Sequence, residues 1–169
     1  MAILEIRKVG DKVLKEKAEP VVKIDRKIIR LLEDMAETMY HADGAGLAAP
    51  QVGIPLRMFV ADAGDGLREI INPVIVEQTG LEIGSEGCLS IPGVYGDVER
   101  AAFVTVEGLD RKGKKITVSA TGLLARALQH EIDHLDGILF IERAKTLYMD
   151  KKTGNRERIK NHGKNREEV

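Results

Sequence analysis

The sequence predicts a single α+β domain, because a helix, a run of short strands and a second helix follow one another along its 169 residues. Helices and strands do not alternate, as they would in a parallel sheet with crossover helices. A chain of this length buries about 70% of its unfolded surface, which is enough for one core without disulfides. The sequence contains no internal repeat and no low-complexity segment, so we expect one domain.

The first predicted helix covers residues 25–43. Asp25 suits the N-cap position, where its carboxylate would accept a backbone N–H of the first turn. Gly44 can end the helix in the left-handed conformation. Apolar side chains recur at helical spacing and would face the core: Ile28, Leu32, Met35 and Met39.

Strands are predicted in the middle of the chain, where short segments rich in Ile and Val are separated by Gly or Pro. These segments are 55–61, 69–76 and 79–84. Pro73 would sit at a sheet edge or a bulge, because proline has no N–H to donate. Alternation with a period of two over 103–107 and 115–120, with a turn signal at 110–113, predicts a hairpin.

A second helix is predicted over 122–136, with Thr121 as its cap and Gly137 as its stop. Beyond residue 144 the sequence becomes polar and charged. We therefore expect a domain over 1–144 and a basic helix or tail over 145–169, which either belongs to the same domain or is mobile.

Charge and composition argue against several classes of function. Lys and Arg number 26 and Asp and Glu 27, so the net charge of −1 gives no support for binding to DNA or to an anionic membrane. Trp is absent and aromatic residues make up 4%, which argues against a platform for stacking bases. The single Cys suits a reducing compartment, and neither a signal peptide nor a membrane-spanning apolar run is apparent. We expect a soluble cytoplasmic protein.

The sharpest motif is HEIDH at 130–134. On a helix, His130 and His134 lie on one face and can grip one metal ion. Glu131 lies beside them, where its carboxylate can reach a water on that ion. Burying these polar groups without partners would cost kilocalories each, so a metal is expected there. The remaining side of the helix carries polar residues: Arg126, Gln129 and Asp133.

Two histidines leave the third ligand position of a catalytic metal site open. Phe140 stands where metzincin proteases place a third histidine. Glu157 lies at a distance comparable to that of the third ligand in thermolysin-like sites, but in the polar tail. Cys88 is the other candidate, because a thiolate and two imidazoles form a tetrahedral site with one open position. Residue chemistry favours Cys88.

A glycine-rich segment at 44–51 lacks the ending of a phosphate-binding loop, and no predicted strand precedes it. Its small residues would let another backbone approach, which suits a peptide substrate or a tight turn. Gln51 could donate its side-chain amide to an oxyanion.

Three segments together resemble the signature motifs of the peptide deformylases: GAGLAAPQ at 44–51, EGCLS at 86–90 and QHEIDH at 129–134. They occur in the order of that family and at compatible spacing, and the resemblance extends to about residue 140. It implies the deformylase α+β fold, with mixed or antiparallel sheets packed around the helix that carries the histidines. It also implies removal of the N-formyl group from the formylmethionine of newly made proteins, with release of formate.

The resemblance further implies roles for individual residues. The metal ligands would be Cys88, His130 and His134. The ion would be divalent, typically Fe²⁺ in this family, with Zn²⁺, Ni²⁺ or Co²⁺ as substitutes. Glu131 would act as general base and acid, while the Gln51 amide and the Leu89 backbone N–H would hold the oxyanion. Substrate contacts would come from Gly46, Gly87, Leu123 and Ala127.

Two positions depart from the family pattern. Ala45 replaces a branched aliphatic residue that many members carry, and Tyr95 stands where some members have Arg. The resemblance therefore leaves open which side chains the pocket tolerates and which residues are preferred beyond the first.

Two other functions stay open on the sequence. A metalloendoprotease would need a ligand other than Cys88, such as Glu157. A non-catalytic metal-binding or ribosome-binding module would rely on the segment from Lys145 to Arg166, where eight basic residues accompany two acidic ones. In an enzyme, the same segment could be an accessory that contacts ribosomal RNA. A solvated tail without a partner is the favoured interpretation of this segment.

Overall fold

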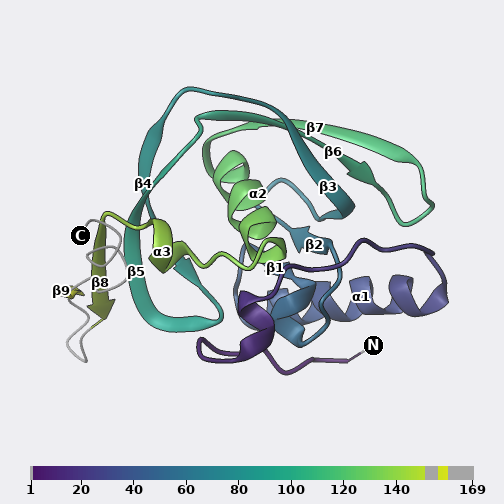
Figure 1. Ribbon diagram of the computed structural model, residues 1–169, viewed down its shortest axis with the longest axis horizontal. Coiled ribbons are helices and arrows are strands. Elements are labelled where there is room, and N and C mark those ends of the chain that lie inside the picture. Colours follow the sequence, from purple (N-terminus) through teal and green to yellow (C-terminus); the bar gives the residue numbers. More distant parts are fainter. Residues whose placement is uncertain (1, 151–155, 160–169) are drawn as a thin grey trace.

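Helix α2 (Gly122–Leu135) lies at the centre of the molecule, between two antiparallel sheets (Figure 1). This computed structural model describes residues 2–150 and 156–159. A second long helix, α1 (Arg26–His41), covers the other face of the larger sheet. The arrangement confirms the predicted α+β class with sheets packed around the helix that carries the histidines.

The larger sheet has five strands in the order β1-β2-β3-β6-β7, and the smaller sheet has four in the order β4-β5-β8-β9. Within the described residues, neighbouring strands of both sheets are antiparallel. The five strands are β1 (Gly46–Ala48), β2 (Met58–Ala61), β3 (Arg68–Thr79), β6 (Phe103–Leu109) and β7 (Lys115–Thr121). The four are β4 (Glu82–Cys88), β5 (Ile91–Arg100), β8 (Thr146–Asp150) and β9 (Arg156–Ile159).

Strand β2 shows why the larger sheet needs a helix on each face. Phe59 belongs to the core cluster that α2 shares with this sheet, whereas Met58 and Val60 belong to the cluster shared with α1. All four residues of β2 are fully buried, so the strand reads as one continuous apolar run. The order of layers is therefore α1, five-stranded sheet, α2 and four-stranded sheet.

Helix α1 begins as predicted but ends differently. The Asp25 carboxylate accepts the Ile28 N–H at 3.1 Å, which confirms the N-cap. The left-handed residue after the helix is Asp43, with φ 57°, and not Gly44. Gly44 is instead required by close packing, because a Cβ there would lie 2.6 Å from Leu89 Cδ1. The missing side chain lets Leu89 pack against the turn that follows α1.

The middle strands follow the predicted pattern with two corrections. The predicted segment 79–84 does not form one strand, because β3 continues to Thr79 and β4 begins at Glu82. The short β1 and the long β5 were not predicted, since Pro92, Gly93 and Gly96 interrupt the apolar pattern of β5. Pro73 lies at an irregularity in the pairing of β3 with β6, as expected of a bulge. The hairpin of β6 and β7 is confirmed.

Helix α2 is buried on nearly all sides. Thr121 is the N-cap residue, as predicted, but its side chain makes no capping hydrogen bond. Gly137 follows it with φ 74°, and a Cβ there would lie 2.6 Å from the Lys15 carbonyl oxygen. The polar residues Gln129 and Asp133 are also buried, because they face hydrogen-bond partners rather than water.

The C-terminal part corrects the expectation of a helix or tail where the structure describes it. A short helix, α3 (Phe140–Arg143), packs Phe140 into the core of the smaller sheet. Residues 146–150 then form β8, which pairs with β5, and 156–159 form β9. The rest of the basic segment, 151–155 and 160–169, lies outside the described residues.

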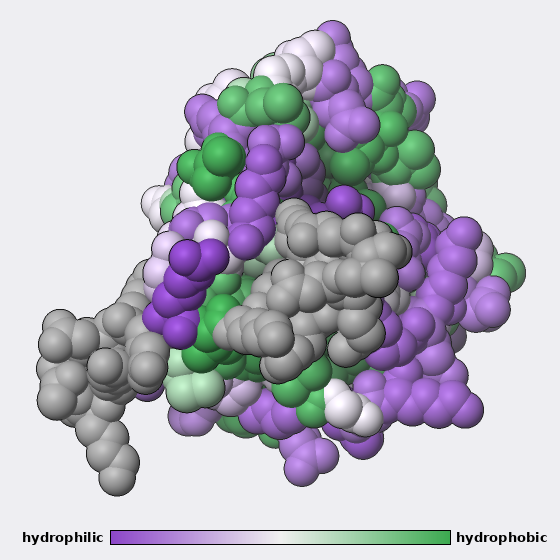
Figure 2. All heavy atoms as spheres, turned by 60° about the vertical axis from the view of Figure 1, so that its left-hand side comes forward, coloured by the Kyte–Doolittle hydropathy of each residue, from purple (hydrophilic) through white to green (hydrophobic). Residues whose placement is uncertain are grey.

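Two 3₁₀ turns complete the fold: η1 (Lys12–Lys15) and η2 (Ala49–Val52). Figure 2 shows the surface on the side of the smaller sheet, where hydrophilic and apolar side chains lie beside one another. Among the helices of 2–150, none is long and apolar enough to cross a membrane.

Candidate metal centre and active site

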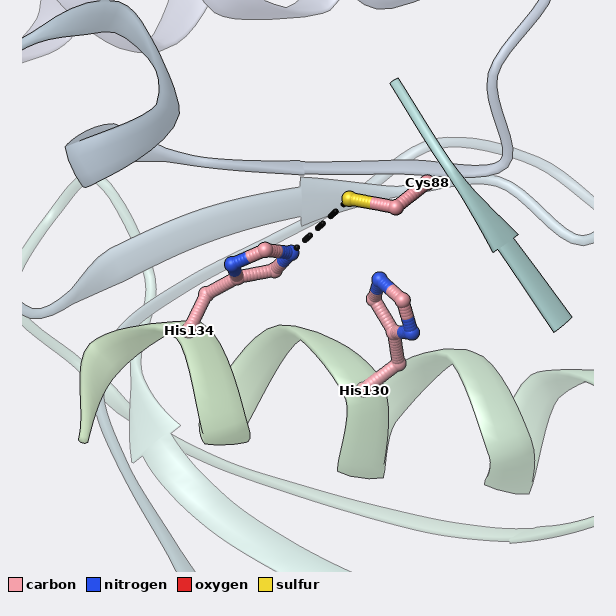
Figure 3. Close-up of side chains that lie close together, drawn as sticks. All are labelled: Cys88, His130 and His134. Atoms are coloured by element: carbon pink, nitrogen blue, oxygen red, sulfur yellow. Dashed lines mark hydrogen bonds between the residues drawn. The ribbon is translucent and has the colours of Figure 1, made fainter. Parts of the chain in front are cut away.

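Three side chains from two different layers meet beside α2. Figure 3 shows the imidazoles of His130 and His134 rising from the helix toward Cys88, which ends strand β4. The Cys88 Sγ and His134 Nε2 atoms are 3.3 Å apart, and one ligand atom from each of the three residues lies within 4.8 Å of the others. A tetrahedral ion with bonds of about 2.3 Å to sulfur and about 2.1 Å to nitrogen separates those two atoms by roughly 3.6 Å. The three residues therefore fit one metal ion.

The His130 ring is fixed from two directions. Its Nδ1 lies 2.8 Å from Glu86 Oε1, so that this carboxylate can accept the ring N–H and leave Nε2 for a metal. Phe140 stacks on the ring, with centroids 6.1 Å apart. Burial lowers the pKa of His130, but hydrogen bonds with Cys88 and Glu86 outweigh it and raise the pKa to about 10. A metal would have to displace that proton.

His134 has the opposite electrostatic character. Burial and the neighbouring His130 charge hold its pKa well below the usual range, so the ring is neutral and can act as a ligand. Its Nδ1 is buried without a hydrogen-bond partner among the described residues. The two imidazoles therefore differ, since a carboxylate anchors only that of His130.

Glu131 is a buried carboxyl group next to these candidate ligands. Only 3% of the residue is exposed, and its Oε1 has no hydrogen-bond partner within the described part of the chain. Burial is the main reason that its pKa rises to about 7. Gly46 of β1 makes room for it, because a Cβ at Gly46 would overlap Glu131 Oε2. A carboxyl group with this pKa suits proton transfer near neutral pH.

Gln51 reaches the same place from η2. Its Oε1 accepts the Ala48 N–H at 2.9 Å, which fixes the orientation of the amide. Its Nε2 then donates to Ser90 Oγ at 3.1 Å and approaches Cys88 Sγ at 3.5 Å. Gln51 is 1% exposed, so this donor group is preorganised beside the sulfur.

A cavity of about 480 Å³ opens onto the site. All the predicted catalytic and substrate-binding residues line it: Gln51, Leu89, Glu131, Gly46, Gly87, Leu123 and Ala127. Ala45 and Tyr95, the two positions that depart from the family pattern, line it as well. Gly87 lets Tyr95 pack closely, because a Cβ there would lie 2.9 Å from the Tyr95 ring. The cavity is large enough for a side chain of methionine size.

Sequence reasoning missed the charged residues that support the site. The Glu86 carboxylate accepts two hydrogen bonds from Arg100, at 2.8 and 2.9 Å, and one from Arg126, at 2.8 Å. Burial alone would raise the pKa of Glu86, but Arg100 and His130 hold it well below its usual range. The polar residues on one side of the predicted helix could have indicated these supporting charges. Polar side chains that become buried need hydrogen-bond partners, and such partners had to lie nearby.

The alternative third ligand, Glu157, has a different place in the fold. Its backbone pairs with that of Met149, in strand β9 at the far edge of the sheet from β4. The group of potential ligands found in the described residues contains Cys88 and the two histidines.

Comparison with known proteins agrees with this geometry. The model of the polypeptide deformylase family matches residues 3–150. The peptide deformylase of Pelotomaculum thermopropionicum is 62% identical over 147 residues, which cover 87% of this chain and 95% of that protein. That of Carboxydothermus hydrogenoformans is 57% identical over 144 residues, covering 85% and 95%.

Solved structures are similar over the same region. The crystal structure of peptide deformylase from Thermotoga maritima superposes with a TM-score of 0.83 at 44% identity, over 85% of this chain and 98% of that one. The enzyme from Synechococcus elongatus, solved in complex with actinonin, gives a TM-score of 0.82 at 47% identity, over 84% and 79% of the two chains.

Proposed function

Because the chain belongs to the polypeptide deformylase family, its reaction is metal-dependent removal of the N-formyl group from newly made proteins, and we propose which residues perform it. The observation that carries the proposal is the meeting of Cys88, His130 and His134 beside the buried carboxyl of Glu131. The products are formate and a free amino terminus.

Cys88, His130 and His134 would hold the metal, with Fe²⁺ as the ion in the cell and Zn²⁺, Ni²⁺ or Co²⁺ as substitutes. One thiolate and two imidazoles suit both ferrous iron and zinc. When bound, the metal polarises the formyl carbonyl and lowers the pKa of water. The Cys88 sulfur has a donor nearby in Gln51 Nε2, at 3.5 Å, which supports its thiolate form.

Glu131 would move the proton. Its carboxylate takes a proton from the attacking water and passes it to the nitrogen of the leaving amine as the C–N bond breaks. Glu131 must be deprotonated when it takes the proton and protonated when it gives the proton away. A pKa of about 7 allows both states near neutral pH. Gly46 keeps the carboxylate close to the substrate-facing edge of β1.

Gln51 and Leu89 would stabilise the oxyanion that develops on the formyl oxygen. The amide of Gln51 is already oriented by Ala48, and the backbone N–H of Leu89 follows the Cys88 ligand directly. One preorganised donor of this kind typically contributes about 3 kcal/mol to the transition state.

The substrate backbone would add a strand between two sheet edges. Strand β1, with Gly46, lies at an edge of the larger sheet, and strand β4, with Gly87, lies at an edge of the smaller one. Both edges face the cavity, so an extended peptide can pair with them. Leu123 and Ala127 would then contact the methionine side chain, and the small Ala45 widens this pocket.

The proposal also includes a cytoplasmic location and a contact with the ribosome. A single free Cys and a substrate made by the ribosome support a cytoplasmic enzyme. The segment from Lys145 to Arg166 would contact ribosomal RNA through its excess of basic residues. In the described part, Lys145 pairs with Glu99 at 3.0 Å. Cosedimentation with ribosomes that weakens steeply with salt would support this contact, and association that is absent or independent of salt would remove it.

The decisive experiment is formate release from formyl-Met-Ala-Ser by the wild type and by Glu131→Ala, with metal content measured on both. We expect the variant to keep its metal and to lose nearly all turnover, because it loses the proton carrier but no ligand. Full activity in Glu131→Ala would overturn the role of Glu131.

A further inference from the structure

A continuous series of ion pairs connects the surface of α3 to the metal site. Arg143 of α3 binds Asp133 of α2 through two hydrogen bonds, Nε to Oδ2 at 2.6 Å and Nη2 to Oδ1 at 3.0 Å. Asp133 Oδ2 also accepts Arg100 Nη1 at 2.6 Å. Arg100 in turn makes its two hydrogen bonds with Glu86. Glu86 Oε1 lies 2.8 Å from Nδ1 of His130.

Three members of this series are almost completely removed from water. The residues Arg100, Glu86 and Asp133 are 5%, 6% and 8% exposed, whereas the Arg143 side chain is 46% exposed. Charges in such an environment are weakly screened, so each pair depends on the geometry of the next. Arg143 is therefore the outer end of a buried series whose inner end is a metal ligand.

Arg143 and Arg100 share one oxygen of Asp133, which makes the position of that carboxylate critical. With Arg143 in place, the forked guanidinium fixes both oxygens of Asp133 in one orientation. Without it, Oδ1 has no arginine partner, and Asp133 can turn toward Arg100. Arg100 would then be drawn away from Glu86, and Glu86 would no longer hold the His130 ring at its present angle.

Helix α3 also contacts the His130 imidazole directly. Phe140, at the start of this four-residue helix, stacks on the His130 ring with an angle of 27° between the planes. Arg143 ends the helix. We infer that Arg143 is a positioning residue, which acts through Asp133, Arg100 and Glu86 to hold His130 in the orientation that binds the metal.

This inference rests on the metal site of the proposed function and is tested by metal affinity. The metal-free full-length chain is titrated with Co²⁺ without air, in competition with a chelator, and the thiolate-to-cobalt absorption is recorded. Removing a group that orients a metal ligand typically costs about 10–100-fold in affinity. Arg143 lies three ion pairs beyond Glu86, the group that holds His130 directly, so for Arg143→Met we expect the lower end of this range, a weakening of about tenfold.

Arg57→Met is the matched control. Arg57 also fastens α2, by donating to the Leu135 carbonyl at 2.8 Å and to Asp136 at 2.9 Å, but it has no hydrogen bond to the series. We expect it to lower the Tm and to leave Co²⁺ affinity within about twofold of the wild type. Equal weakening by Arg57→Met and Arg143→Met would show a general effect of helix stability and would overturn the inference.

The path through Glu86 is tested by combining substitutions. In a Glu86→Gln background, Arg143→Met should cause no further loss of affinity, since the connection to His130 is already broken. Independent and additive losses would overturn the inference, as would affinity in Arg143→Met that is unchanged or tighter.

Arg143→Lys separates geometry from charge. Lysine keeps the positive charge but cannot bind both oxygens of Asp133 in the way the guanidinium does. Most of the loss of Co²⁺ affinity should therefore remain in Arg143→Lys. Wild-type affinity in this variant would contradict positioning by geometry. A wild-type protein that neither binds Co²⁺ nor releases formate would instead count against the proposed function. Normal wild-type behaviour with an unaffected Arg143→Met would count only against the role of Arg143.

Discussion

Gly46→Ala should reduce turnover because the new methyl group would displace Glu131. The added Cβ would overlap Glu131 Oε2 and lie 2.8 Å from Glu131 Cδ. Carbon atoms in favourable contact are about 3.5–4.0 Å apart, so the carboxyl group must move by roughly 1 Å. Strand β1 cannot yield easily, since Gly46 pairs with Ala61 of the fully buried β2.

A displacement of this size has a large expected effect on the rate. A misplacement of about 1 Å costs roughly 100-fold, which is within the range of about 10²–10⁴ that a positioned general base provides. We therefore expect kcat for formyl-Met-Ala-Ser to fall by about 100-fold in Gly46→Ala. The metal content should stay unchanged, because the three atoms nearest to the added Cβ all belong to Glu131, which is not one of the proposed metal ligands. The assay is formate release at saturating substrate, divided by bound metal.

Two controls separate displacement of Glu131 from loss of stability. Gly108→Ala places its Cβ 2.5 Å from Ile70 Cγ2, in the same sheet but outside the residues that line the cavity. It should destabilise the fold by about 1–3 kcal/mol and leave kcat nearly unchanged. Glu131→Asp shortens the displaced side chain, so Gly46→Ala should add little to its loss of activity. Wild-type turnover in Gly46→Ala would refute the reasoning.

Three further predictions test the site and the core directly. Cys88→Ser should lose bound metal while Glu157→Gln keeps it, as measured by metal analysis after dialysis; the reverse pattern would favour a protease-like site. The pKa of Glu86 is held below its ordinary value of 4.5, so its ion pairs stabilise the protein above about pH 4.5 and this stability is lost as the pH falls further. The Tm of the metal-free wild type should therefore drop below that pH more steeply than the Tm of Glu86→Gln, and parallel curves would contradict this. Phe59→Ala, at a fully buried position between α2 and the sheet, should lower the free energy of unfolding by about 3–5 kcal/mol in urea denaturation, and a loss below about 1 kcal/mol would be inconsistent with its burial.

The parts of the site that could be predicted from sequence are those in which residue type and local spacing carry the chemistry. His130 and His134 are one helical turn apart, and no other cysteine competes with Cys88 for the third position. The spacing of the histidines places them on one face of α2, and the fold brings Cys88, at the end of β4, close to that face. Gln51 could be identified as a donor, but its orientation depends on the Ala48 N–H, which sequence does not show.

The supporting charges could not be predicted because their pairs join different layers. Arg100 comes from β5, Glu86 from β4 and Asp133 from α2, and no short sequence pattern connects them. Strand β8 was missed for a related reason, since its single fully inward residue, Leu147, lies in a charged neighbourhood that resembles a surface segment. In both cases a tertiary contact outweighs the local pattern.

The proposed metal ligands come from separate layers of the fold, so a bound ion would connect these layers. Cys88 comes from the smaller sheet, whereas both histidines come from a helix whose apolar side belongs to the core of the larger sheet. An ion that bridges them would join the smaller sheet to α2 beside the buried charged groups of Glu86, Arg100 and Asp133. By mass action, a free metal concentration of 1,000 times the dissociation constant would add about 4 kcal/mol to the free energy of unfolding. A chelator should accordingly loosen this junction first, with amide exchange in β4 and β5 accelerating before that in β2.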